Sequence, residues 1–80
     1  MSVSERLKAV VAQTFGVPIE KIDDGTTPAA VPAWDSLGQV ELVRALEQEF
    51  SIEFALEDLM LMNSVREIRS IVEKGNVAEG

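Results

Sequence analysis

Hydrophobic residues recur every three or four positions in three stretches of the chain, which is the spacing of one face of an α-helix. The first stretch covers about residues 3–15, the second about 36–50, and the third begins at Val65 and ends at Lys74–Gly75. A shorter apolar run at 56–60 has room for one further turn of helix. No stretch alternates as a strand would. The pattern therefore predicts an all-α fold, a small four-helix bundle of three main helices and one short helix.

Capping residues stand where these helices are expected to begin and end. Ser2 and Glu5 have the spacing of a capping box, and so do Ser64 and Glu67. Asp35–Ser36 offers an N-cap to the second helix. Gly16, followed closely by a proline, is typical of the end of the first helix.

Residues 17–35 form a long connection between the first two helices. They contain all three prolines and the turn-forming run Asp23–Asp24–Gly25. A loop of this length in a small domain is unusual unless side chains hold it against the core. We expect an ordered loop, held by some of its apolar residues: Val17, Ile19, Ile22, Val31 and Trp34.

The length and charge of the chain narrow its class. Eighty residues predict a single domain, 1–80, with an ordered core at about 3–73 and a frayed end at 76–80. Seven basic against fourteen acidic residues leave a net charge of −7, which argues against nucleic acid and anionic membranes and favours basic protein partners. No apolar run is long enough to span a membrane and no leader pattern is present, so the expected compartment is the cytoplasm.

The chain contains no cysteine and no histidine. Disulfides, thiolate nucleophiles and Cys/His zinc sites are therefore excluded, and the serines lack a histidine to act as base. The carboxylates show no spacing typical of a metal site, so we expect no metal and no enzymatic activity of the chain's own. Any chemistry needs a reactive group attached from outside.

Ser36 is the best place for such an attachment. A serine at the entrance of a helix after a long loop presents its hydroxyl outward, and the helix N-terminus favours a phosphodiester on that oxygen. Asp35 beside it can cap the helix or support the site. The plainer interpretation, in which Ser36 is only a capping residue, remains open on spacing alone.

The segment Asp35-Ser36-Leu37-Gly38-Gln39-Val40-Glu41-Leu42-Val43, followed by Ala45-Leu46-Glu47-Gln48-Glu49-Phe50, resembles the acyl carrier protein family. The resemblance covers about residues 3–73 without a gap. It implies that Ser36 carries 4′-phosphopantetheine, transferred from coenzyme A by a magnesium-dependent phosphopantetheinyl transferase (holo-carrier synthase), and that Asp35 supports it. The thiol of this arm would hold acyl groups as thioesters for enzymes of fatty-acid, lipid or polyketide-like biosynthesis, and the carrier is expected to be a monomer.

The resemblance also implies two surfaces. The helix after Ser36 would dock on acyl-loading and acyl-using enzymes with basic patches, through Leu37, Val40, Glu41, Arg44, Glu47 and Glu49. An acyl chain could be sheltered between the helices by residues that also serve as core: Leu42, Val43, Leu46, Phe54, Leu59 and Met62.

Three residues depart from the pattern of the family. Gly38 stands where an acid is common, Arg44 where an apolar residue is common, and Trp34 where a small residue is common. Gly38 is expected to cost up to about 1 kcal/mol of helix propensity relative to alanine, and Trp34 to anchor the loop. Two alternatives stay open: an aminoacyl carrier of the D-alanyl type, and an acidic protein-interaction module without a prosthetic group.

Overall fold

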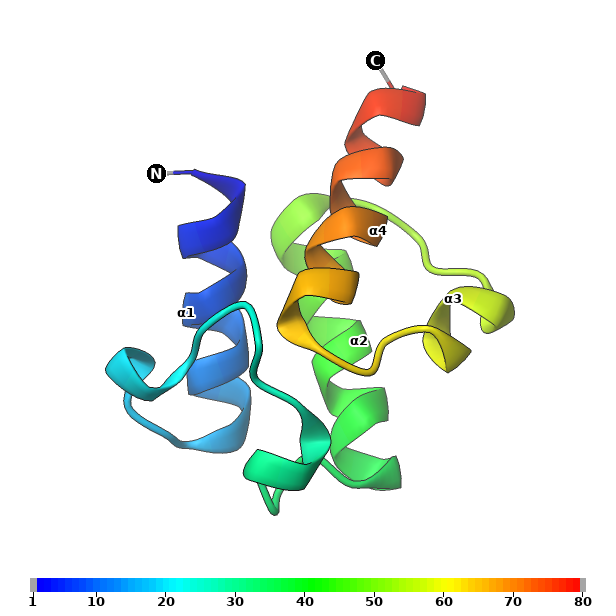
Figure 1. Ribbon diagram of the computed structural model, residues 1–80. Helices are drawn as coiled ribbons and strands as arrows, with labels where there is room; N and C mark the ends of the chain where they lie inside the picture. Colours follow the sequence, from blue (N-terminus) through cyan, green and yellow to red (C-terminus); the bar gives the residue numbers. More distant parts are fainter. Residues whose placement is uncertain (1, 80) are drawn as a thin grey trace.

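The structure is a computed structural model that describes residues 2–79 of the chain, with side chains described for residues 2–74. The element order is α1 (Val3–Phe15), η1 (Ile19–Lys21), η2 (Pro28–Ala30), α2 (Ser36–Phe50), α3 (Leu56–Met60) and α4 (Val65–Glu79), where η marks a 3₁₀ turn (Figure 1). Residues 2–79 contain no strand. The predicted all-α fold of three long helices and one short helix is confirmed.

The predicted capping box begins α1. Ser2 Oγ accepts a hydrogen bond from the Glu5 amide at 3.1 Å, and the Ser2 amide donates to Glu5 Oε1 at 3.3 Å. The Ser2 hydroxyl also donates to Glu5 Oε1, at 3.2 Å. The bonds that Glu5 Oε1 accepts, from the Ser2 amide first and from this hydroxyl second, lower the pKa of the Glu5 carboxyl from its ordinary value because they stabilise the carboxylate. At the other end Gly16 has φ 67°, a left-handed conformation that glycine adopts without steric cost, and its amide donates to the Ala12 carbonyl.

The last helix is longer than its sequence pattern predicted. Ser64 Oγ accepts a hydrogen bond from the Glu67 amide at 3.2 Å, as expected for the start of α4. The predicted end at Lys74–Gly75 is wrong, because α4 continues to Glu79. A glycine ends a helix only where the backbone turns left-handed; within a helix it costs about 1 kcal/mol, which the helix can tolerate. Fraying of 76–80 stays a prediction, and residue 80 lies outside the described residues.

The core is built where α1 packs against α2 and α4 (Figure 1). Its fully enclosed side chains come from these helices and from the segment before α4. They are Leu7, Val11, Leu42, Leu46, Met62, Val65, Ile68 and Val72. Spacing of three or four residues within each helix places them on one face, as the hydrophobic pattern predicted.

The connection between α1 and α2 is ordered, as expected. Ile22, Val31 and Trp34 are buried and Val17 is partly buried against the core, whereas Ile19 lies exposed on η1 and does not hold the loop. Of the five candidate residues, Ile19 is therefore the one that does not anchor the loop. The Ile19 side chain, at the start of the short η1 turn, is exposed to solvent, whereas Ile22, directly after the turn, is buried.

The same connection also supplies hydrogen bonds to the start of α4. The amides of Val65 and Arg66 donate to the carbonyls of Thr26 and Asp24, each at 3.0 Å. Arg69 Nη1 lies 3.2 Å from Asp24 Oδ2. Since the first amides of a helix have no partner within the helix, these contacts fix the loop and the helix together.

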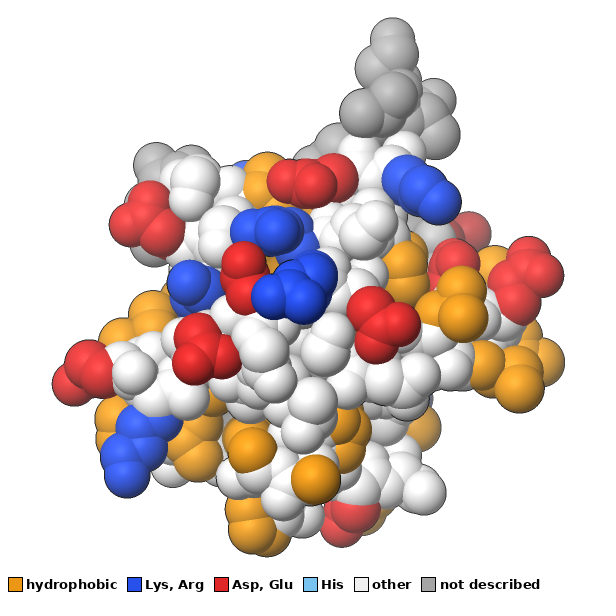
Figure 2. All heavy atoms as spheres, viewed as in Figure 1, with side chains coloured by type: hydrophobic (Ala, Val, Ile, Leu, Met, Phe, Trp, Pro, Cys, Tyr) orange, Lys and Arg blue, Asp and Glu red, His pale blue; other side chains and the backbone are white. Residues whose placement is uncertain are grey.

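Acidic and basic side chains are interspersed on the face seen in Figure 2, and hydrophobic side chains gather where α3 lies. These include Leu56 and Met60, which are 77% and 75% exposed. Within residues 2–79 no helix has the length and apolar character needed to cross a bilayer.

Candidate functional site

Ser36 lies exposed at the first position of α2. The preceding Asp35 is the N-cap, and its Oδ1 accepts a hydrogen bond from the Gly38 amide at 2.8 Å. The sequence predicted that Asp35 and Ser36 together provide the N-cap of this helix. In the structure Asp35 alone is the N-cap. The Ser36 hydroxyl is therefore not needed to satisfy the helix end and is open to a reagent from solvent.

The position of Ser36 suits a phosphodiester. Orphan amides and the positive end of the helix dipole meet at the first turn of α2, a helix of 15 residues. Asp35 already uses one oxygen to accept the Gly38 amide, which fixes its side chain beside the serine. This geometry fits a phosphopantetheine ester on Ser36 Oγ, with Asp35 acting on the helix start rather than on the group itself.

Gly38 packs against the loop that leads to Ser36. A Cβ at this position would overlap with the carbonyl oxygen of Ala33 and would lie 3.0 Å from Phe15 Cε1. Only the absence of a side chain allows α2 to approach the loop and the end of α1 so closely. Gly38 thus has a packing role that its helix propensity does not reveal.

Trp34 anchors the loop, as predicted. It is buried, and its ring stacks on Phe15 with centroids 5.6 Å apart. Its Nε1 donates to Gln39 Oε1 at 2.6 Å, and Gln39 Nε2 donates to the Leu59 carbonyl at 3.2 Å. One glutamine side chain therefore links the loop before Ser36, the helix after it, and α3.

The residues predicted to dock on partners divide into two groups. Leu37 and Val40 are 71% and 51% exposed, and Glu41 and Arg44 are exposed on the same side of α2. Positions 37, 40, 41 and 44 are three or four apart, so they form one strip that begins beside Ser36.

The other two predicted docking residues have partners inside the molecule. Glu47 Oε2 accepts a hydrogen bond from the Phe54 amide at 3.0 Å, which holds the chain that leaves α2. Glu49 Oε2 lies 3.0 Å from Arg6 Nε, and the Glu49 carbonyl accepts from Arg6 Nη2 at 2.7 Å. The structure thus turns Glu49 toward α1 and does not bring it to the strip of Leu37 and Arg44.

The six residues predicted to shelter an acyl chain all belong to the hydrophobic core. Leu42, Leu46 and Met62 are fully buried, while Val43, Phe54 and Leu59 are partly buried against them. A chain could enter among them only by separating side chains that now touch. The fold therefore brings these six residues together, but they pack against one another as part of the core.

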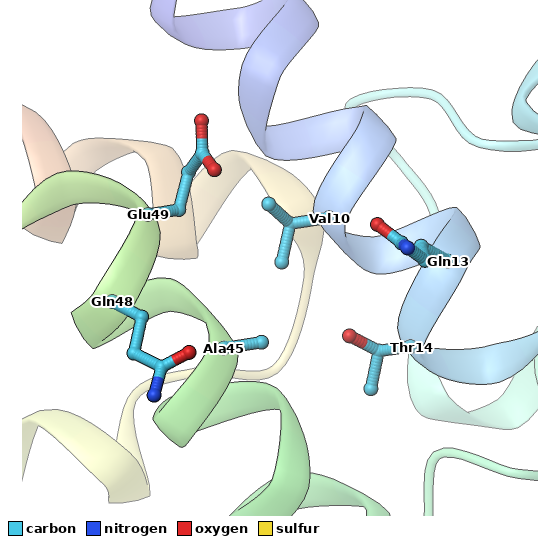
Figure 3. Close-up of a pocket in the computed structure, with 6 residues that line it drawn as sticks. All are labelled: Val10, Gln13, Thr14, Ala45, Gln48 and Glu49. Carbon is cyan, nitrogen blue, oxygen red and sulfur yellow. The ribbon is translucent and has the colours of Figure 1, made fainter.

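Shallow depressions lie at the surface near α2, two of them between α1 and α2. One, of about 250 Å³, lies beside Ser36 and is lined by its neighbours Asp35 and Leu37. Another, of about 290 Å³, lies farther along the two helices, where Val10 and Thr14 of α1 face Ala45 of α2 (Figure 3). A third, of about 280 Å³, lies between the segment after α2 and α4, lined by residues that include Phe54, Leu61 and Ile71.

Several residues that shape the site were not identified from the sequence. Phe15, Ala33 and Gln39 position the loop and the first turns of α2. In the hydrophobic pattern Phe15 is only the last position of the predicted helix at 3–15, and a polar residue such as Gln39 gives no sign of its hydrogen-bond partners. Their contacts depend on the packing of segments far apart in the chain.

Comparison with known proteins agrees with this geometry. The family model described as "Phosphopantetheine attachment site" matches residues 5–72. The acyl carrier protein of Solidesulfovibrio magneticus is 31% identical over 74 residues, which cover 92% of this chain and 95% of that protein. The acyl carrier protein of Buchnera aphidicola subsp. Acyrthosiphon pisum (strain Tuc7) is 32% identical over 76 residues, 95% of each chain.

A solved structure extends the comparison to three dimensions. The solution NMR structure of a holo acyl carrier protein from Geobacter metallireducens is similar with a TM-score of 0.87 and 26% identity, over 99% of this chain and 91% of that one. Matching sequence, matching fold and an exposed serine at the start of α2 agree with one another. The chain belongs to the acyl carrier protein family, as a carrier rather than an enzyme, and its prosthetic group is 4′-phosphopantetheine.

Proposed function

We propose that Ser36 is the residue that carries the 4′-phosphopantetheine arm, and that the chain holds acyl intermediates as thioesters on it. The observation that carries this proposal is the exposed Ser36 hydroxyl directly after the capping residue Asp35. It lies within the residues matched by the phosphopantetheine family model. The lack of cysteine in the chain is consistent with a thiol that arrives on the arm.

Attachment requires one substitution at phosphorus. Ser36 Oγ forms a bond to the phosphorus of coenzyme A that bears the pantetheine, and the pyrophosphate bond to the nucleotide breaks. The hydroxyl proton passes to the transferase, and the nucleotide leaves as a bisphosphate. The amides at the start of α2 favour the negative charge that remains on the ester. The bound arm supplies the thiol at which thioesters form.

We propose the exposed strip of Leu37, Val40, Glu41 and Arg44 as the α2 docking face. Its apolar residues lie next to Ser36, and Glu41 offers a negative charge to basic patches of the transferase and of acyl-loading enzymes. Charges at the rim of an interface mainly set the association rate and its salt dependence. Such binding suits a carrier that must visit several enzymes and leave each of them.

Within this proposal Glu47 and Glu49 contribute less to docking than the four residues of the docking face. Their intramolecular bonds to Phe54 and Arg6 leave them less available to a partner. The core residues Leu42, Val43, Leu46, Phe54, Leu59 and Met62 are the proposed shelter for an acyl chain, because they form the apolar interior closest to α2 and α3.

We further propose that the carrier works in the cytoplasm, in fatty-acid, lipid or polyketide-like biosynthesis. The relatives reported above are named acyl carrier proteins, which favours acyl groups over amino acids as the cargo. Arg44 adds a positive charge to the docking face, and this charge repels a basic residue placed opposite it. The proposal therefore favours partners that have no basic residue facing Arg44.

Intact mass spectrometry tests the attachment. Incubation of the purified protein with coenzyme A, Mg²⁺ and a promiscuous phosphopantetheinyl transferase is expected to add the mass of one phosphopantetheinyl group. Ser36→Ala is expected to abolish the addition, whereas Ser70→Ala, which removes another exposed hydroxyl on α4, is expected to leave it intact. An unmodified wild-type chain, or full modification of Ser36→Ala, contradicts the proposal.

A further inference from the structure

The depression beside Ser36 continues along the line where α1 and α2 meet. It is lined by Asp35 and Leu37, by Gly38 and Glu41 of α2, by Ala33, and by Thr14 and Phe15 of α1. Thr14 also lines the next depression, with Val10 and Ala45 (Figure 3). We call these two adjoining depressions the α1–α2 seam. It begins at the residues that flank Ser36 and runs toward the middle of both helices.

We propose that the phosphopantetheine arm, when its thiol is free, rests in the α1–α2 seam. This inference rests on the proposed attachment to Ser36. The tether gives the arm a high effective concentration at the seam, because the residues on both sides of Ser36 line its entrance. A contact too weak to hold a free ligand can then keep the arm in place.

The chemistry of the seam matches that of the arm. The pantoyl part carries two geminal methyl groups, which suit the apolar walls formed by Phe15, Ala33 and Leu37. The arm also contains two amides. Thr14 offers a hydroxyl to an amide carbonyl, and the exposed carboxylate of Glu41 can accept an amide N–H.

Close packing keeps the floor of the seam firm. Gly38 lies against the Ala33 carbonyl and Phe15, and Trp34 stacks on Phe15. A firm floor lowers the entropic cost of holding the arm. Because Phe15 lies between the seam and the indole, contact with the arm is also expected to alter the environment of Trp34, the only tryptophan of the chain.

The seam lies on a different side of α2 from the hydrogen bond to α3. Gly38 and Glu41 are three positions apart and line the seam, whereas Gln39 turns toward Leu59. The free arm and a chain buried among Leu46, Leu59 and Met62 would therefore lie in different places, one between α1 and α2 and the other in the core toward α3. Spectra of the two regions can tell these positions apart.

NMR spectroscopy of the apo and holo forms tests the proposal. Nuclear Overhauser contacts are expected between the geminal methyl groups of the arm and both the Phe15 ring and the Ala33 methyl group, with amide shift changes at Thr14. Contacts to Leu59 or Met62 in their place, or changes confined to residues 35–37, overturn the proposal. Mass spectrometry of the same samples keeps this failure distinct from a failure of attachment, since the holo mass shows that Ser36 was modified.

Two matched variants sharpen the test. Ala33→Glu places a carboxylate at the wall of the seam and is expected to abolish the contacts between the arm and Phe15, together with the apo-to-holo change in Trp34 emission. Ala30→Glu adds the same charge to an exposed alanine of η2, outside the seam, and is expected to keep both signals. Equal loss in the two variants, or retention in Ala33→Glu, argues against the seam as the resting place.

Discussion

Gly38 in α2 lies so close to the carbonyl oxygen of Ala33 that a Cβ at position 38 would overlap with that oxygen. The same Cβ would lie 3.0 Å from Phe15 Cε1. From helix propensity alone, alanine at this position should stabilise α2 by up to about 1 kcal/mol. The contact with the loop reverses that expectation, because backbone cannot move aside as a flexible side chain can.

We expect Gly38→Ala to lower the free energy of unfolding by about 1–3 kcal/mol, the usual cost of overpacking, despite the gain in propensity. Urea denaturation followed by circular dichroism measures the change. Gly25→Ala is the control, since its added Cβ would meet its nearest neighbour, Asp23 Oδ1, at an ordinary 3.5 Å. A Gly38→Ala protein as stable as wild type would show that the loop at Ala33 moves enough to make room for the added methyl group.

Gln39 accepts a hydrogen bond from Trp34 and donates one to Leu59. A methionine side chain has a similar length but cannot replace these bonds. We expect Gln39→Met to lower the free energy of unfolding by about 1–3 kcal/mol, because the indole N–H of the buried Trp34 loses its acceptor and the Leu59 carbonyl loses one of its donors while keeping the Met62 amide. Urea unfolding followed by Trp34 fluorescence reports both the stability and the local change. Gln48→Met, at an exposed position of the same helix, should stay close to wild type; equal effects of the two changes would mean that the bonds of Gln39 contribute nothing.

The pKa of Glu5 is lowered in the folded protein by its bonds to Ser2, the backbone bond first. A carboxyl with a lower pKa in the folded state stabilises the fold at pH above its unfolded pKa and loses that contribution as the pH falls through the folded pKa. NMR titration of the Glu5 carboxyl carbon should show the lowered pKa, and Ser2→Ala, which removes the Ser2 hydroxyl but keeps its backbone N–H, should raise that pKa part of the way toward the ordinary value. An unchanged pKa in Ser2→Ala would show that the Ser2 hydroxyl contributes nothing to the lowering.

Charge on the α2 docking face is expected to control how fast the transferase finds its substrate. Glu41→Lys should slow transfer of phosphopantetheine several-fold at low ionic strength, because it replaces attraction to a basic patch by repulsion. The difference should shrink as salt is added. Glu73→Lys makes the same charge change on α4, away from Ser36, and should have little effect. Equal slowing by both variants would indicate a response to net charge rather than to a docking face.

The sequence predicted helices well where local chemistry decides them. Ser2 with Glu5 and Ser64 with Glu67 have the capping spacings, and the structure contains the corresponding bonds. The end of α4 could not be predicted from Gly75, because a glycine ends a helix only if the chain turns there, and that depends on more than local pattern.

The site was predictable in its centre and less so around it. Ser36 and Asp35 are neighbours in the chain, so their relation to the start of α2 follows from local rules. Glu49 was predicted on the docking face, but its partner Arg6 is 43 positions away and lies on another helix. Side-chain partners across such separations are set by packing, which spacing within one helix does not describe.

The exposed Leu56 and Met60 of α3, with Leu61 just after it, would ordinarily favour self-association, since two apolar surfaces that pack together are removed from water. Two copies that met there would each bring a net charge of −7. Mutual repulsion of the copies opposes that encounter and weakens when counterions screen it. The surplus of acid thus gives the carrier colloidal stability, and it leaves the apolar side chains of α3 open to a partner of opposite charge.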